Sequence, residues 1–188
     1  MNFDAQCDMA AVVYGADDDP DRVLSDFAAD LRRAGRRPVG VVQIGRSCRS
    51  ENPRLGVVML PDGHVVELAS HEETRATGCR LDFDQLAGLA DRLAAAIEDG
   101  ADLVILNRFG RSEAEGSGLI DLIPQAIEAD IPVLLAVPEW RFPALIRFSN
   151  GMNVRLACRR EALDHWWRTV AGRSGRDSGA GTFCELAK

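Results

Sequence analysis

The chain has 188 residues, a formal charge of −7 and an apolar content of 46% with 6% aromatic residues. This length suits one domain with a complete hydrophobic core. The acidic balance argues against nucleic-acid binding, because affinity for phosphate backbones comes from clustered Lys and Arg. No stretch approaches the roughly 18 apolar residues of a membrane span, and residues 1–10 carry acids where a secretory signal has a basic region. We therefore expect a cytoplasmic protein without membrane insertion.

The first half of the chain predicts a strand, a helix and a second strand, followed by a hairpin. A β-branched apolar run over residues 9–15 indicates a buried strand. Apolar residues spaced by three and four predict a helix that opens at Asp19-Pro20 and closes at Ala34-Gly35. A strand over residues 39–44 follows, and a crossover of this size makes the two strands parallel. Residues 56–70 then read as an antiparallel hairpin with its turn at Pro61-Asp62-Gly63.

The second half repeats the alternation of helices and apolar strands. Helices are expected over residues 84–98 and around 119–127, and strands over 103–106 and 131–137. A short helix near 144–148, a strand over 153–157 and a helix over 161–170 complete the pattern. The glycine- and serine-rich residues 172–188 predict a disordered tail. The sequence thus predicts one α/β domain over residues 1–171, with a mainly parallel sheet and an inserted hairpin.

The junction after the first strand is where nucleotide-binding sheets place a phosphate loop, because backbone N–H groups and a helix N-terminus converge there. Aligned with G-x-x-x-x-G-K-[ST] from Gly15, the second glycine becomes Pro20, the lysine becomes Asp21 and the hydroxyl residue becomes Arg22. A carboxylate about 5 Å from a phosphate charge opposes binding by about 3 kcal/mol at a dielectric near 20. We therefore expect no ordinary Mg-ATP site, and the identity of any cofactor stays open.

The acids of this junction, Asp17, Asp18, Asp19 and Asp21, allow two interpretations. One is a site for a cation or a basic partner. The other, which we favour, is a helix N-cap with carboxylates placed favourably near the positive end of the helix dipole.

The segment after the strand over residues 103–106 carries the most informative polar residues. In an open parallel sheet, ligands bind outside the carboxyl ends of the strands, and arginine holds oxyanions through paired hydrogen bonds. In the alternative interpretation, the amide and glycines shape a turn, Ser117 caps the next helix, and the charges are solvated. The candidate ligand-binding residues of this segment are Asn107, Arg108, Gly110, Arg111, Glu113, Gly116 and Gly118.

A third group of candidates follows the second strand and precedes the helix over residues 84–98. Gln43 and Arg46 belong to the first part, and Cys79 and Arg80 to the second. A thiol beside a guanidinium can have a lowered pKa or bind a soft ligand, although a small apolar filler is the commoner role. Whether these residues share one site with Asn107 and Arg108 is left open.

The order of the pieces resembles the thermophilic-type nucleoside triphosphatases of the P-loop class. In that family a D-E-x-G-x-x-E segment ends the Walker B strand, and Asn107, Gly110 and Glu113 match its first acid, its glycine and its final glutamate. The Walker A signature is absent, and Asn107 replaces the metal-side aspartate. The resemblance implies the P-loop-like three-layer fold but not hydrolysis.

The motifs V-V-Q, G-C-R-L-D and N-R-F-G-x-x-E-x-x-G-x-G are closer to a bacterial domain family of unknown function. Its members are often labelled molybdenum-transport accessory proteins. The resemblance favours a non-hydrolytic accessory protein that binds an oxyanion or another small ligand. Two alternatives remain: a divergent nucleoside triphosphatase or phosphotransferase with Glu113 as base or metal ligand, and a protein-interaction module. Whether the protein is an enzyme is therefore open, with the balance against it.

Overall fold

The computed structural model describes residues 8–44, 56–67 and 83–174. Its elements in chain order are β1 (Met9–Tyr14), α1 (Pro20–Arg33), β2 (Pro38–Ile44), β3 (Gly56–Leu60), β4 (Val65–Glu67), α2 (Phe83–Glu98), β5 (Leu103–Leu106), α3 (Arg111–Ala114), α4 (Leu122–Glu128), β6 (Val133–Pro138), the 3-10 helix η1 (Glu139–Arg141), α5 (Phe142–Phe148), β7 (Val154–Ala157) and α6 (Arg160–Ser174).

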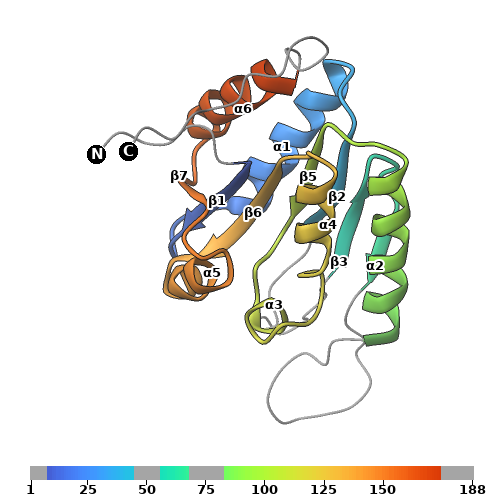
Figure 1. The fold of residues 1–188 in the computed structure, drawn as a ribbon, viewed down its shortest axis with the longest axis horizontal. Helices are drawn as coiled ribbons and strands as arrows, with labels where there is room; N and C mark the ends of the chain where they lie inside the picture. The colour runs from blue at the N-terminus through green and yellow to red at the C-terminus, as the bar shows by residue number, and fades with distance from the viewer. Residues whose placement is uncertain (1–7, 45–55, 68–82, 175–188) are drawn as a thin grey trace, which may run out of the picture.

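The seven strands form one sheet in the order β4-β3-β2-β5-β6-β1-β7. Strands β2, β5, β6, β1 and β7 are parallel, and β3 and β4 extend the β2 edge as an antiparallel hairpin. Strand β6 separates β1 from β5, with Leu135 level with both Ala11 and Leu106. The carboxyl ends of β1 and β5 therefore lie at the same edge of the sheet, one strand apart (Figure 1).

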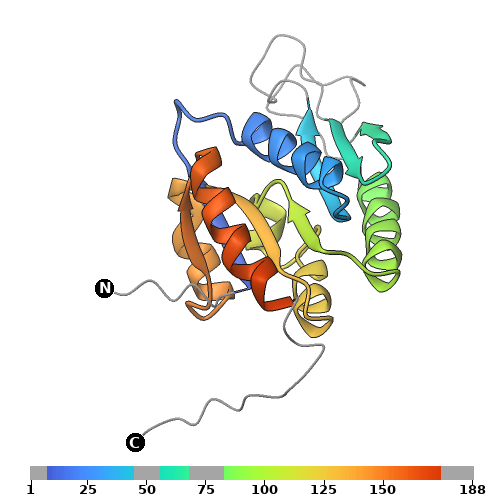
Figure 2. The same ribbon diagram turned by 90° about the horizontal axis from the view of Figure 1, so that it is seen from above.

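Helices cover both faces of the sheet (Figures 1 and 2). On one face, Leu24, Phe27 and Leu31 of α1 pack with residues of α6 against alternate strand positions such as Val12 and Ile105. On the other face, residues of α2, α4 and α5 pack against the remaining positions. Continuous burial along β1, β2, β5 and β6 follows from this cover on both sides. The protein is a P-loop-like three-layer α/β domain, as the sequence predicts.

The differences from the predicted elements lie at the ends of helices. Ser117 does not cap α4, which begins five residues later at Leu122; its hydroxyl instead donates to the carbonyl of Ser112. The four-residue helix α3 was not expected, because its only turn is too short to show apolar periodicity. Helix α6 continues to Ser174, so residues 172–174 are helical and do not belong to the predicted tail. The rest of that prediction, residues 175–188, lies outside the described part.

The predicted hairpin is confirmed over β3 and β4, and its last residues, 68–70, are not described. Within the described ranges, no helix has the length and apolar character needed to cross a membrane.

Candidate functional site

A carboxylate from the start of α1 is bound by two residues at the end of β5. The Asn107 amide Nδ2 donates to Asp21 Oδ1 over 2.7 Å. One terminal nitrogen of Arg108 lies 3.1 and 3.2 Å from the two oxygens of the same carboxylate. The side chains of Asp21 and Arg108 are 27% and 29% exposed, so the ion pair is partly shielded from water. We call Tyr14, Asp21, Asn107 and Arg108 the bridge cluster.

The loop between β1 and α1 uses its other acids to bind its own backbone. Asp18 Oδ2 accepts a hydrogen bond of 2.8 Å from the N–H of Gly15. Asp19 is the N-cap of α1, and its Oδ1 accepts from the N–H of Arg22 over 3.0 Å. These N–H groups are of the kind that bind phosphate in a phosphate loop, and here carboxylates occupy them. The N-cap interpretation is confirmed for Asp19.

Three buried polar atoms of the bridge cluster have no hydrogen-bond partner among the described residues. They are Tyr14 Oη, Asn107 Oδ1 and Arg108 Nε. The guanidinium carbon of Arg108 lies 5.3 Å from the centre of the Tyr14 ring, so the ring and the cation are in contact. Buried polar atoms are nearly always paired with protein, water or ligand. The cluster therefore offers two unused donors, on Tyr14 and Arg108, and one unused acceptor on Asn107.

One titrating group of the bridge cluster, Tyr14, and one beside it, Cys158, are held in their neutral forms. Burial raises the pKa of the Tyr14 hydroxyl, and the nearby Arg108 acts in the opposite direction. Cys158 follows β7 directly, next to the end of β1. Burial, with the negative charges of Asp18, Asp19 and Asp21, raises the pKa of its thiol to about 11. Cys158 is thus a neutral thiol at physiological pH rather than a reactive thiolate.

Glu113 is bound within its own loop. Its carboxylate accepts hydrogen bonds from the N–H groups of Gly110, at 2.8 Å, and Leu119, at 3.3 Å. Gly118 adopts a φ of +75°, and a Cβ at this position would lie 2.3 Å from Glu113 Oε1. Gly116 has a φ of +80°. In this state the two glycines and Glu113 shape the loop, and both oxygens of Glu113 are engaged with the backbone.

The other predicted site residues do not join the bridge cluster. Arg111 is exposed and pairs with Glu115 at 2.8 Å. Gln43 is buried on β2 at the alternation of Val39 and Val41, which belong to the sheet face opposite α1. Arg46, Cys79 and Arg80 lie outside the described residues. The structure thus brings together Asn107 and Arg108 with Asp21, whereas Arg111 pairs with Glu115 and Gln43 belongs to the other face of the sheet.

The acids of the loop between β1 and α1 are the candidate cation site of the sequence. In the described part of the chain, no group of three or more His, Cys, Asp and Glu side chains is arranged to hold a metal ion. The loop's carboxylates diverge, because Asp18 and Asp19 turn to the backbone and Asp21 turns to β5.

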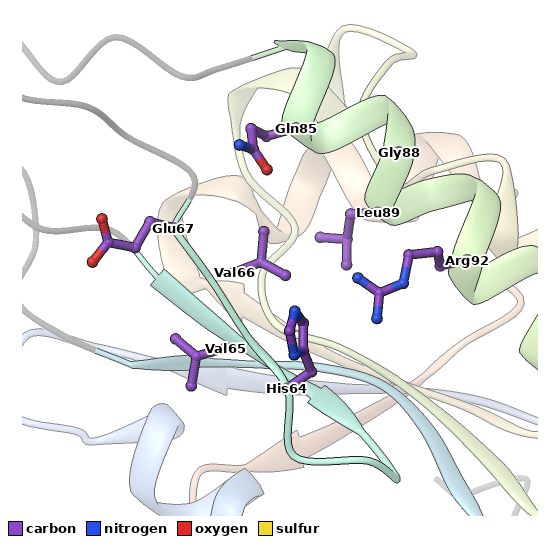
Figure 3. Close-up of a pocket in the computed structure, with 8 residues that line it drawn as sticks. All are labelled: His64, Val65, Val66, Glu67, Gln85, Gly88, Leu89 and Arg92. Atoms are coloured by element: carbon purple, nitrogen blue, oxygen red, sulfur yellow. The ribbon is translucent and has the colours of Figure 1, made fainter.

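A separate groove of about 630 Å³ lies between the edge strand β4 and α2 (Figure 3). His64 and Arg92 extend into it from opposite sides, whereas Glu67 points away from it. Of the predicted site residues that the structure describes, none lines this groove. The residues that line it are His64, Val65, Val66, Glu67, Gln85, Gly88, Leu89 and Arg92.

Sequence reasoning does not identify Tyr14, a member of the bridge cluster, or Cys158, which lies beside it. Both stand at the carboxyl end of a parallel strand, the position at which ligands bind in such sheets. That positional rule was applied to the residues after β2 and β5 and would have found these two as well. The contact between Asp21 and Asn107 had no sequence signal, because 86 residues separate them.

The fold defines the class as a P-loop-like α/β domain. The chain belongs to the family described as "protein of unknown function (DUF2478)", which matches residues 9–166. It is 38% identical over 172 residues to "Molybdenum import ATP-binding protein ModC 2" of Bradyrhizobium diazoefficiens. That alignment covers 89% of this chain and 19% of the relative, so the chain spans about a fifth of the relative's length. No solved structure matches the chain significantly.

Proposed function

We propose that this domain is a non-hydrolytic accessory domain of molybdenum import that binds a small oxyanion at the bridge cluster. The observation that carries the proposal is the Asp21 carboxylate, itself an oxyanion, held by the Asn107 amide and the Arg108 guanidinium. An oxyanion that displaces Asp21 would meet the same donors. Arginine suits this role because its fork of N–H groups matches the spacing of oxygens on an oxyanion.

The unused atoms of the cluster support a ligand larger than a carboxylate. Tyr14 Oη and Arg108 Nε each carry a hydrogen that no described residue accepts. A tetrahedral oxyanion has more oxygens than a carboxylate and would accept from both. Asn107 Oδ1 would accept from a water or a hydroxyl of the ligand.

The name of the relative supports the proposed role in molybdenum import. A segment similar to this chain forms 19% of a protein named for molybdenum import and ATP binding. Molybdate is a tetrahedral oxyanion, so the named context and the chemistry of the bridge cluster point to the same class of ligand.

Nucleotide hydrolysis is the less favoured function. The position of the phosphate-binding lysine is Asp21, and its carboxylate holds Arg108. The N–H groups of Gly15 and Arg22 are bound by Asp18 and Asp19. A nucleotide phosphate would have to displace three carboxylates and would be repelled by them.

Thermal unfolding with a ligand series tests the proposal. The protein is heated with molybdate, tungstate, sulfate or phosphate, and with ATP or GTP with and without Mg²⁺. A ligand at 100 times its dissociation constant adds about 2.7 kcal/mol to the stability of the folded state. We expect a rise in Tm with a tetrahedral oxyanion, no rise in the variant Arg108→Ala, and the wild-type rise in the matched control Arg111→Ala.

Two results would overturn the proposal. The absence of a shift with every oxyanion removes the oxyanion site. A shift with ATP that needs Mg²⁺ and disappears in Arg108→Ala favours the nucleotide hydrolase instead. Each variant is compared with its own ligand-free Tm, so that a loss of intrinsic stability does not count as a loss of binding.

A further inference from the structure

Exposed apolar side chains gather in one short part of the chain. In the described ranges, seven large apolar side chains are exposed, and four of them fall within 13 residues on η1, α5 and the turn that follows. We call these four, Trp140, Ile146, Phe148 and Met152, the α5 patch. Trp140 is 72% exposed and Met152 is 68% exposed. Large apolar side chains gathered in this way mark interaction surfaces more often than single exposed residues do.

The geometry of the helix groups part of this patch on one outer face. Helix α5 continues directly from η1, so Trp140, Pro143 and Ile146 follow one another at three-residue spacing. Residues at this spacing are neighbours on a helix surface. The opposite side of α5 is anchored in the core through Leu145, which is fully buried. The exposed face is therefore rigidly presented, with Trp, Ile and Pro side by side.

Two cations border the patch. The guanidinium of Arg141 stacks on the Trp140 ring, 4.1 Å from its centre. Arg147 follows Ile146 on the exposed side of α5. Neither arginine forms an ion pair with any described residue. In a chain with a net charge of −7, an apolar surface bordered by two unpaired arginines is complementary to an apolar surface that carries carboxylates.

The α5 patch is connected to the bridge cluster. The ring of Phe148 lies 6.4 Å from that of Phe109, the residue next to Arg108. The charge of Arg141 reaches Tyr14 and acts to lower the pKa of its hydroxyl. A partner bound to α5 would thus contact a helix that packs against the segment holding the Asp21 carboxylate.

We infer that the α5 patch docks the ATP-binding protein of a molybdenum importer, through an apolar surface of that protein bordered by carboxylates. The choice of partner rests on the proposed role in molybdenum import, because the relative joins a similar segment to other parts of an import ATP-binding protein. The location of the contact rests on the patch alone. Trp, Met and Arg are enriched in protein interfaces, and Trp and Arg are the commonest residues that dominate their affinity.

An anionic membrane is the less favoured occupant. The patch contains a helix of only seven residues, and the acidic residues 17–19 lie at the same edge of the sheet. Negative charge at that edge opposes the approach of anionic lipids. A folded protein can place its carboxylates opposite the two arginines alone, whereas a membrane presents negative charge to the whole edge.

The inference is tested by measuring the binding of the full chain to an ATP-binding protein of a molybdenum importer by biolayer interferometry. The chosen partner has no DUF2478 segment of its own. We expect Trp140→Glu and Ile146→Glu to weaken binding by more than tenfold. The matched control is Ile127→Glu on α4, because Ile127 and Ile146 are 44% and 42% exposed. We expect this control to bind like wild type. Arg147→Glu should weaken binding by severalfold, whereas Arg92→Glu on α2 should not.

Four results would overturn the inference: no binding by the wild type, equal binding by Ile146→Glu and Ile127→Glu, a wild-type dimer in sedimentation that Ile146→Glu abolishes, or patch-dependent binding to phosphatidylglycerol vesicles. Failure of the docking inference can be distinguished from failure of the proposed oxyanion site. If the oxyanion site is wrong, neither the wild type nor Ile146→Glu shows an oxyanion-dependent rise in Tm. If only the docking surface is wrong, both show that rise.

Discussion

The loops after β1 and after β5 end at the same edge of the sheet, yet they use their carboxylates in opposite ways. In the β5 loop, Glu113 turns inward and binds the backbone of Gly110 and Leu119. In the β1 loop, Asp21 reaches across to the other loop and binds Asn107 and Arg108. The difference separates a carboxylate that shapes its own loop from one that joins two loops. In the proposed function, only the second gives way to a ligand, because its release leaves the hydrogen bonds within its own loop intact.

The largest effect is expected for Glu113→Ala, which breaks the inward contact. Two partly buried N–H groups lose a charged acceptor, and each such hydrogen bond contributes about 1.5–3 kcal/mol. We expect the free energy of unfolding, measured in urea, to fall by about 3 kcal/mol. The matched control is Glu115→Ala, which removes an exposed carboxylate in the same loop. Equal losses in both variants would contradict a structural role for Glu113.

A smaller loss is expected for Asp21→Ala, which breaks the contact between the loops. The Arg108 guanidinium and the Asn107 amide, both at least partly buried, lose a charged partner. We expect the free energy of unfolding, measured in urea, to fall by about 2 kcal/mol. The exposed neighbour Asp17 provides the control, and Asp17→Ala should leave stability unchanged. In a double-mutant cycle, Asp21→Ala should cost less in an Arg108→Ala background than in the wild type, because only the hydrogen bond with Asn107 is left to lose. Additive losses would show that Asp21 and Arg108 do not interact.

Within the β1 loop, Asp19→Ala should lower stability by about 1 kcal/mol, the usual contribution of an N-cap side chain. Asp19→Asn keeps the acceptor oxygen and should retain most of that contribution. The free energy of unfolding of both variants is measured in urea. A loss of the same size in Asp19→Asn would mean that the charge, and not the hydrogen bond, stabilises the start of α1.

The least perturbing test needs no substitution. It measures the reactivity of the Cys158 thiol, whose pKa is raised by burial and by the acids of the β1 loop. The pKa of the Cys158 thiol is raised from 9.0 to about 11, so at pH 8 its thiolate fraction is about 100-fold lower than that of an ordinary thiol with the lower value. Alkylation of the peptide that contains Cys158, followed by mass spectrometry, should therefore be much slower in the folded protein than in urea. The rate should rise with pH up to about 11. Equal rates at pH 8 would contradict the partly buried position of Cys158 near the acids of the β1 loop.

The sequence predicts the layers of this fold better than its site. Apolar runs and helical spacing locate the parallel strands and the longer helices. A strand buried on both faces needs a continuous apolar run, and a helix buried along one stripe needs apolar residues spaced by three and four. The position of Asn107 and Arg108 after a strand makes them candidate ligand-binding residues, and ligand binding by them stays a prediction. The pairing of Asp21 with them was not predictable, because a contact over 86 residues depends on the order of strands in the sheet. Glu113 is a candidate base because it matches the final glutamate of the D-E-x-G-x-x-E segment. Such a match gives the residue type but not the direction of the side chain, which here turns to its own loop.

The affinity for molybdate of Asp21→Asn, compared with wild type, tests most directly whether Asp21 occupies the position of a ligand. Isothermal titration calorimetry at one pH and one ionic strength measures both dissociation constants. The asparagine keeps the shape and an acceptor oxygen, so the bridge cluster stays assembled, but the competing negative charge is gone. We predict that Asp21→Asn binds molybdate at least about tenfold more tightly, a difference of about 1.4 kcal/mol. Equal or weaker binding by Asp21→Asn would contradict the account.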